Sequence, residues 1–154
     1  MKLFLMQHGD ALAKDVDPER RLSQAGRSDV ERVAAFLATR INVAHIMHSG
    51  KSRALETAEI VAKLLESQTS IKVFSGINPS DPVEAFAQQV DDWNENLLVV
   101  GHLPFLAKLV AYLLTGSAHE SIVSYTPGSI VCLESAGDEG WQLQWMVRPE
   151  LVRE

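Results

Sequence analysis

The sequence predicts an α/β fold of three layers: a central, mostly parallel sheet of about six strands, helices on both faces and one antiparallel edge. Short apolar runs alternate along the chain with longer segments whose apolar residues recur at helical spacing. Residues 97–100 are apolar throughout, as expected of a strand that is buried on both faces. Near the chain's end, two apolar runs flank residues 137–140, whose composition is typical of a hairpin turn and predicts the antiparallel edge.

The first half of the chain contains the signals of a strand and a helix in succession. The apolar run at residues 2–6 ends abruptly at Gln7, which indicates a strand followed by a loop. Ser23 is a favourable N-cap, and the apolar positions after it predict a helix to about Arg40. Three further elements are expected here: a strand at residues 44–49, a helix to about Leu65 and an edge strand at residues 71–74.

The second half repeats the alternation. A loop rich in Gly, Pro, Asn and Asp at residues 76–82 leads into a helix through about Asp92, and the buried strand at residues 97–100 follows. Pro104 suits the first position of another helix, and Gly116 suits its end. The last two strands are expected at residues 129–134 and 141–147.

Size and composition indicate one globular domain over residues 1–154. Hydrophobic residues make up 46% of the chain and charged residues 22%, and no repeat, low-complexity segment or linker interrupts it. The formal net charge is −6 and no Lys or Arg run stands out, which argues against nucleic-acid binding.

Cysteine content and apolar runs bear on the compartment. The single cysteine, Cys132, cannot form an internal disulfide, which fits a reducing compartment. The N-terminal apolar run is too short for a signal peptide, and no apolar stretch approaches the ~20 residues needed to cross a bilayer. A cytoplasmic protein without membrane association is therefore expected.

Polar clusters that contain a histidine follow three of the predicted strands. The first cluster is Gln7-His8-Gly9-Asp10, the second runs from His48 to Arg53, and the third begins at Gly101-His102. In open α/β sheets, ligands bind beyond the carboxyl ends of the strands. We therefore expect the three clusters to converge on one edge of the sheet.

Phosphoryl transfer is the chemistry that suits this set. A neutral imidazole can attack phosphorus and carry the phosphoryl group covalently, and the charge that develops on the oxygens needs cationic donors fixed beforehand. Arg53 offers a planar fork for two oxygens at a predicted helix start, where backbone N–H groups add positive potential. A protonated His102 would add a donor, and Gly9 and Gly101 would let the backbone approach the anion.

These clusters resemble the motifs of the histidine phosphatase superfamily, which also includes the phosphoglycerate mutases. Residues 7–11 resemble its Arg-His-Gly motif, and residues 22–26 its Leu-Ser/Thr-x-x-Gly segment. Residues 48–58 resemble its second arginine motif and residues 99–102 its second histidine motif. The matches stand in the family's order from Lys2 to about Leu114. The short chain, without the large insertions of mutases and phytases, is most similar to the SixA-type phosphohistidine phosphatases.

The resemblance implies a role for each motif residue. His8 would be the nucleophile that becomes phosphorylated, and Arg53 and His102 would bind and neutralise the transferring group. No metal or organic cofactor is implied, and no pair of histidines has the spacing of zinc ligands. The implied partner is a phosphohistidine-bearing protein of signal transduction, either a phosphotransfer domain or a phosphocarrier. Phosphate or sulfate is the implied anionic ligand.

The residue before the nucleophile departs from the family pattern. The family has Arg there and this chain has Gln7, so a charged hydrogen bond worth about 1.5–3 kcal/mol is replaced by a neutral one of roughly half that. A loss of that size could slow the reaction by ~10-fold or more. Lys51, within the second arginine motif, is a candidate to replace part of the charge.

A general acid has no clear match in the sequence, although Asp81 and Glu84 lie in a plausible loop region. An alkoxide leaves poorly without a proton, whereas phosphohistidine loses an imidazole, a better leaving group. This favours phosphohistidine over sugar phosphates. Two alternatives stay open: a phosphatase of small phosphate esters, and a binding module for phosphate or phosphoproteins whose catalysis is weakened or lost through Gln7.

Overall fold

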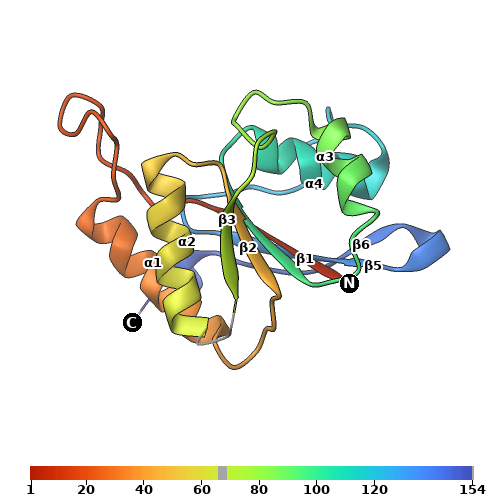
Figure 1. Ribbon diagram of the computed structural model, residues 1–154, viewed down its shortest axis with the longest axis horizontal. Coiled ribbons are helices and arrows are strands. Elements are labelled where there is room, and N and C mark those ends of the chain that lie inside the picture. Colours follow the sequence, from red (N-terminus) through yellow and green to blue (C-terminus); the bar gives the residue numbers. More distant parts are fainter. Residues whose placement is uncertain (66–68, 154) are drawn as a thin grey trace.

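A six-stranded sheet forms the centre of the computed structural model, which describes residues 1–65 and 69–153 (Figure 1). Its strands are β1 (Lys2–Gln7), β2 (His45–His48), β3 (Ser70–Val73), β4 (Leu97–Gly101), β5 (Ile130–Ser135) and β6 (Trp141–Val147). Their order across the sheet is β3-β2-β4-β1-β5-β6. Strands β3, β2, β4 and β1 pair in parallel, whereas β5 is antiparallel to both neighbours. The predicted α/β fold with a mostly parallel sheet is confirmed.

Helices cover both faces of this sheet. They are α1 (Gln24–Leu37), α2 (Ser52–Leu65), α3 (Val83–Val90) and α4 (Phe105–Thr115), with short 3-10 helices η1 (Gly137–Glu139) and η2 (Pro149–Leu151). Figure 1 shows α1 and α2 together on one side and α3 and α4 on the other. Successive residues of β1 serve the two cores in turn, because side chains alternate across a strand. Phe4 and Met6 pack with α1 and α2, whereas Leu3 and Leu5 pack with α3 and α4.

Helix α1 begins where its N-cap predicts and ends earlier than expected. The Ser23 hydroxyl accepts a hydrogen bond from the Gly26 N–H at 3.0 Å, as predicted for a capping serine. The helix ends at Leu37 and not at about Arg40. The N–H groups of Arg40 and Ile41 both donate to the Leu37 carbonyl, and this turn brings the chain back to the sheet, where Val43 is buried.

The strands differ in burial as their patterns predict. Every residue of β4 is buried, in agreement with its uninterrupted apolar run. β3 lies at the edge of the sheet, and Val73 is 66% exposed. β4 and β1 therefore lie side by side in the interior of the sheet, where the loops that follow them are held by buried neighbours.

Helix α4 differs from the prediction by one position at its start. It begins at Phe105, so Pro104 is its N-cap and not its first helical residue. Gly116 ends it in a left-handed conformation with φ +82°, as predicted. Within residues 1–65 and 69–153, no helix combines the length and the apolar character that crossing a membrane requires.

Candidate active site

The clusters after β1, β2 and β4 meet at the carboxyl edge of the sheet. Gln7 at the end of β1 is in register with Gly101 at the end of β4, so His8 and His102 leave neighbouring strands at the same level. The His8 N–H donates to the Gly101 carbonyl at 3.0 Å, and the two imidazole rings lie 5.0 Å apart between centroids. The parallel register therefore produces the juxtaposition that the sequence predicts.

One ring nitrogen of His8 is held by the backbone. Nδ1 lies 2.7 Å from the Gly9 carbonyl oxygen. A carbonyl oxygen can only accept, so Nδ1 carries the proton and donates it. The lone pair therefore resides on Nε2. This is the tautomer in which a neutral imidazole is a nucleophile at the end of the ring that points away from its own backbone.

Burial keeps the His8 imidazole neutral. Loss of solvent lowers the pKa of His8 below the ordinary histidine value, and the positive charges of Arg53 and Arg20 lower it further. The hydrogen bond to Gly9 and the Asp10 carboxylate act in the opposite direction without reversing the shift. Near neutral pH the nucleophilic form therefore predominates.

The acid titration of His8 should accordingly occur below the ordinary histidine range of about 6.5. Because the neutral form is favoured, we expect the Nδ1–H tautomer to persist as the pH falls through that value, and protonation of Nε2 only at lower pH. Heteronuclear NMR of the imidazole carbons and nitrogens would follow both events, with a short histidine peptide as the reference. A midpoint at or above that of the peptide would contradict the buried, cation-flanked site.

Gly9 and Gly101 pack closely against neighbouring side chains. The Gly9 N–H donates to the Thr57 hydroxyl at 3.0 Å. A Cβ at Gly9 would lie 2.7 Å from the Val30 side chain, and a Cβ at Gly101 would lie 3.3 Å from Leu106. Packing is therefore one reason for each glycine, and the approach of their backbone to an anion stays a prediction.

Thr57 joins the His8 loop to the helix that carries Arg53. It is fully buried, accepts the Gly9 N–H and donates its own proton to the Arg53 carbonyl at 2.8 Å. Sequence reasoning missed this role, although the available signal was the position of Thr57 one helical turn after Arg53. The hydroxyl fixes the distance between the two motifs, which are far apart in the sequence.

Arg53, on the first turn of α2, offers a donor that nothing in the described chain uses. Its Nε is buried without a hydrogen-bond partner among residues 1–65 and 69–153. Burial and the charge of Arg20 lower the pKa of Arg53 from its usual value, yet a guanidinium remains protonated in proteins. The result is a permanent, partly desolvated cation close enough to His8 to influence its pKa.

His102 is neutral in this site, contrary to the protonated donor expected from the sequence. It is 1% exposed, and burial, then the proximity of the second titratable ring of His8 and the charges of Arg53, Lys51 and Arg20, lower the pKa of His102 to about 3. Its Nε2 lies 2.6 Å from the Ser49 hydroxyl. Its Nδ1 is buried and, within the described residues, has no partner.

Ser49 holds the His102 ring in place. The Ser49 hydroxyl oxygen accepts the Lys51 N–H at 3.4 Å and lies 2.6 Å from Nε2 of His102. In the tautomer in which Ser49 donates to Nε2, the proton of neutral His102 is on Nδ1, and the ring then has one directed donor.

Removing that hydroxyl should weaken catalysis more than stability. In Ser49→Ala, His102 loses the group that holds its ring, and we expect kcat/KM to fall roughly 10-fold, the scale of outer hydrogen-bond partners. Ser49→Thr keeps the hydroxyl and should retain most of the activity. Steady-state kinetics with thermal unfolding of both variants would check this; equal losses in both would contradict the role of the hydroxyl.

Three other polar residues complete the surroundings. Gln7 is 7% exposed, and its Oε1 has no partner in the described part of the chain. Lys51 precedes α2, where its carbonyl accepts the N–H groups of Ala54 and Leu55, and its charge reaches His102. Arg20, which sequence reasoning missed, influences His8, Arg53 and His102. Its signal was the pair of basic residues, Arg20 and Arg21, before the Leu22-Ser23 segment.

The carboxylates considered as general acids have local structural partners. Asp81 accepts the Asn78 N–H at 2.8 Å and closes a turn before α3. Glu84 lies in the first turn of α3. Asp10 accepts the Ser23 hydroxyl proton at 2.7 Å, which ties the His8 loop to the start of α1. In residues 1–65 and 69–153, no group of three or more His, Cys, Asp or Glu side chains is arranged to hold a metal ion.

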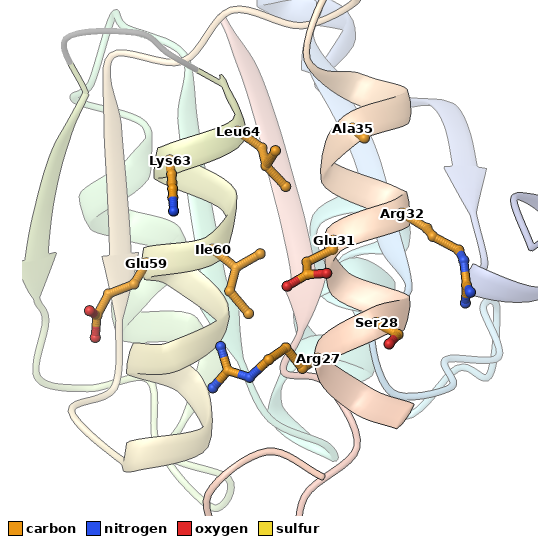
Figure 2. A pocket seen from close by; sticks show the side chains of 9 residues that line it. All are labelled: Arg27, Ser28, Glu31, Arg32, Ala35, Glu59, Ile60, Lys63 and Leu64. Carbon is orange, nitrogen blue, oxygen red and sulfur yellow. The ribbon is translucent and has the colours of Figure 1, made fainter. Parts of the chain in front are cut away.

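A separate cavity of about 620 Å³ lies on the outer side of α1 and α2 (Figure 2). Figure 2 shows Arg27, Glu31, Glu59 and Lys63 around the apolar side chains of Ile60 and Leu64. None of the residues proposed from the sequence lines it. The candidate active site is defined by its side chains and not by this groove.

Two histidines, His8 and His102, thus lie beside each other at the carboxyl edge of an α/β sheet, with Arg53 on the helix that follows β2. Residues 3–77 match the model of the histidine phosphatase superfamily (branch 1), so this part of the chain is similar to that superfamily. The chain is similar to the phosphohistidine phosphatase SixA of Escherichia coli (strain K12), with 29% identity over 150 residues that cover 93% of each chain.

Solved structures agree with this relationship. The protein histidine phosphatase SixA complexed with tungstate superposes with a TM-score of 0.86 and 25% identity, covering 99% of this chain and 100% of the other. A phosphoglycerate mutase from Bacillus anthracis str. Sterne shares the fold, with a TM-score of 0.76, 14% identity and coverage of 99% and 95%.

Proposed function

We propose that this protein is a phosphohistidine phosphatase that acts on a phosphorylated protein through a phospho-His8 intermediate. The observation that carries the proposal is the arrangement around His8: Nδ1 is tied to the Gly9 carbonyl, which leaves Nε2 free, and unpartnered polar atoms of Arg53 and His102 lie nearby. A buried donor without a partner is costly, and a phosphoryl oxygen would satisfy both.

The first step transfers the phosphoryl group to His8. The Nε2 lone pair attacks phosphorus while the P–N bond of the substrate breaks, and the substrate imidazole leaves as a neutral ring once its other nitrogen is protonated. Arg53 donates to the equatorial oxygens, and Nδ1–H of His102 donates to one of them. The His8 ring becomes positively charged, and the Gly9 carbonyl stabilises that charge through Nδ1–H.

The second step regenerates the enzyme. Water attacks the phosphorus of phospho-His8, the P–N bond breaks, and inorganic phosphate leaves with the oxygen from water. One proton of the attacking water stays on the new phosphate oxygen, the other passes to a second phosphate oxygen or to solvent, and the electron pair of the broken P–N bond returns to Nε2. His8 returns to the Nδ1–H tautomer, with the same donors in place. None of these steps requires a metal ion or an organic cofactor, so we propose metal-independent hydrolysis.

The surroundings of the site favour a phosphoramidate over a phosphate ester. Among the described residues, Asp81 and Asp10 already bind local donors and Glu84 belongs to the first turn of α3. An alkoxide leaving group needs a proton donor, whereas a protonated phosphohistidine does not. The proposed partner is therefore a phosphotransfer domain or a phosphocarrier. We propose that both proteins act in the cytoplasm and that residues 1–154 of this chain form one domain.

The decisive experiment compares two substrate classes. Phosphate release would be measured from a histidine-phosphorylated phosphocarrier protein and from an alkyl phosphate, glycerol 3-phosphate, whose leaving group is an alkoxide, each with and without EDTA. We expect turnover of the phosphoprotein, little turnover of the ester and no effect of EDTA. Efficient ester hydrolysis without phosphohistidine turnover would replace the proposal with a small-molecule phosphatase.

The buried, uncharged Gln7 favours one second candidate, a phosphoprotein-binding module with little catalysis. It predicts tungstate binding without turnover of either substrate, even at high enzyme concentration. The same pair of assays, with tungstate affinity as a third measurement, separates it from the phosphatase.

A further inference from the structure

The chain between the nucleophile loop and α1 is a short hairpin. Ala11 pairs with Leu22 in an antiparallel bridge, and the Leu12 N–H donates to the Arg21 carbonyl at 2.8 Å. Asp17 holds the turn, because its carboxylate accepts the backbone N–H groups of Glu19 and Arg21. The hairpin begins three residues after His8 and is anchored at both ends, so its position relative to the site is fixed.

Two adjacent arginines on this hairpin have different surroundings. Arg21 is exposed and pairs with Asp17 at 2.9 Å, so its charge is largely neutralised locally. Arg20 is half-buried, and its Nε donates to the Leu12 carbonyl at 3.1 Å. Within residues 1–65 and 69–153, no carboxylate forms an ion pair with Arg20. The terminal nitrogens of this guanidinium are therefore a cation without a counterion.

The backbone of Arg20 is held in an unfavourable conformation. Its φ is +50°, and among the described residues it alone has a positive φ without being glycine. The left-handed region costs a residue with a side chain about 1 kcal/mol or more, and such conformations concentrate where a side chain must be presented in a set direction. Here the strained residue is Arg20, whose Nε donates to the Leu12 carbonyl. Leu12 lies four positions after His8 in the sequence.

The charge of Arg20 reaches the candidate site. It contributes to lowering the pKa of His8, of Arg53 and of His102. Two like charges, on Arg20 and Arg53, that repel each other in the absence of a ligand are stabilised when an anion lies between them.

We propose that Arg20 is a further phosphoryl-binding residue, whose guanidinium contacts the substrate oxygens from the hairpin that follows His8. This inference rests on the proposed function for the identity of the anion. Because Gln7 carries no charge, Arg20 and Arg53 are the two guanidinium groups of the site. Two permanent cations select a dianionic phosphoryl group, such as a phosphoramidate or a monoester, over a singly charged diester.

Tungstate binding to the folded protein tests the proposal independently of turnover. We expect Arg20→Gln to raise the dissociation constant, measured by calorimetry, by about 10-fold or more, the scale of one charged hydrogen bond. Arg21→Gln is the matched control, since it removes one positive charge from the next residue and keeps the backbone bond to Asp17. It should change the constant less than about 2-fold by general charge screening.

Arg20→Lys separates charge from a loop-holding role. Lys keeps the charge and the same backbone strain but loses the Nε bond to Leu12. Recovery of most of the tungstate affinity in Arg20→Lys would support direct binding, whereas equal losses in the Lys and Gln variants would overturn it. An unchanged constant in Arg20→Gln would also overturn it. If the wild type binds tungstate but hydrolyses no phosphohistidine, the proposed function fails while the Arg20 result still stands.

Discussion

His8→Ala should abolish phosphohistidine turnover, with kcat falling by at least about 10³-fold. The variant removes the proposed phosphoryl acceptor, so hydrolysis can no longer proceed through two easier displacements. The donors of Arg53 and His102 would remain, and with them the ability to bind an oxyanion. The readout is phosphate release from a histidine-phosphorylated protein, together with trapping of a base-stable, acid-labile phosphoenzyme.

The same variant also separates covalent transfer from anion binding. His8→Ala should form no phosphoenzyme and yet bind tungstate measurably, because binding and covalent transfer depend on different groups. His119→Ala, which alters an exposed histidine outside the site, is the control and should behave as the wild type does. A phosphoenzyme in His8→Ala would place the covalent intermediate on another residue and contradict the mechanism.

The sheet was predictable from the sequence because its patterns have a direct physical cause. A strand covered on both faces can tolerate only apolar residues, so the run of β4 could belong to no other position. The alternating edge strand β3 and the capped start of α1 followed from the same reasoning. The end of α1 did not, because the turn after Leu37 depends on where the sheet lies and not on local propensity.

The site was predictable only in its outline. Parallel strands bring their carboxyl ends together, and this rule alone places His8 beside His102. The roles of Ser49, Thr57 and Arg20 depend on hydrogen bonds or charges between residues that are distant in the sequence, and no periodicity encodes them. The protonation of His102 was wrongly predicted for a related reason: burial and neighbouring cations determine it, and neither is visible in the sequence.

Arg53→Gln should reduce kcat/KM by about 100-fold, the second largest effect we expect. Losing a buried charged donor aimed at the transferring group removes about 1.5–3 kcal/mol per hydrogen bond, and a guanidinium can form two. The fold should persist, because the Thr57 bond to residue 53 uses the backbone carbonyl and not the side chain. Steady-state kinetics would be paired with thermal unfolding, and Arg40→Gln, in the exposed turn after α1, is the control.

The lysine variant of the same position distinguishes shape from charge. Arg53→Lys retains a cation but replaces the planar fork with a single ammonium, which cannot donate in parallel to two phosphoryl oxygens. We expect it to bind tungstate better than Arg53→Gln, because a positive charge alone attracts the anion. We expect it to recover little of kcat, because only paired donors match the trigonal phosphoryl group of the transition state. If Arg53→Lys recovered kcat fully, Arg53 would act as a point charge. Nearby Lys51 could then substitute for it, and the planar geometry of the guanidinium would not contribute to kcat.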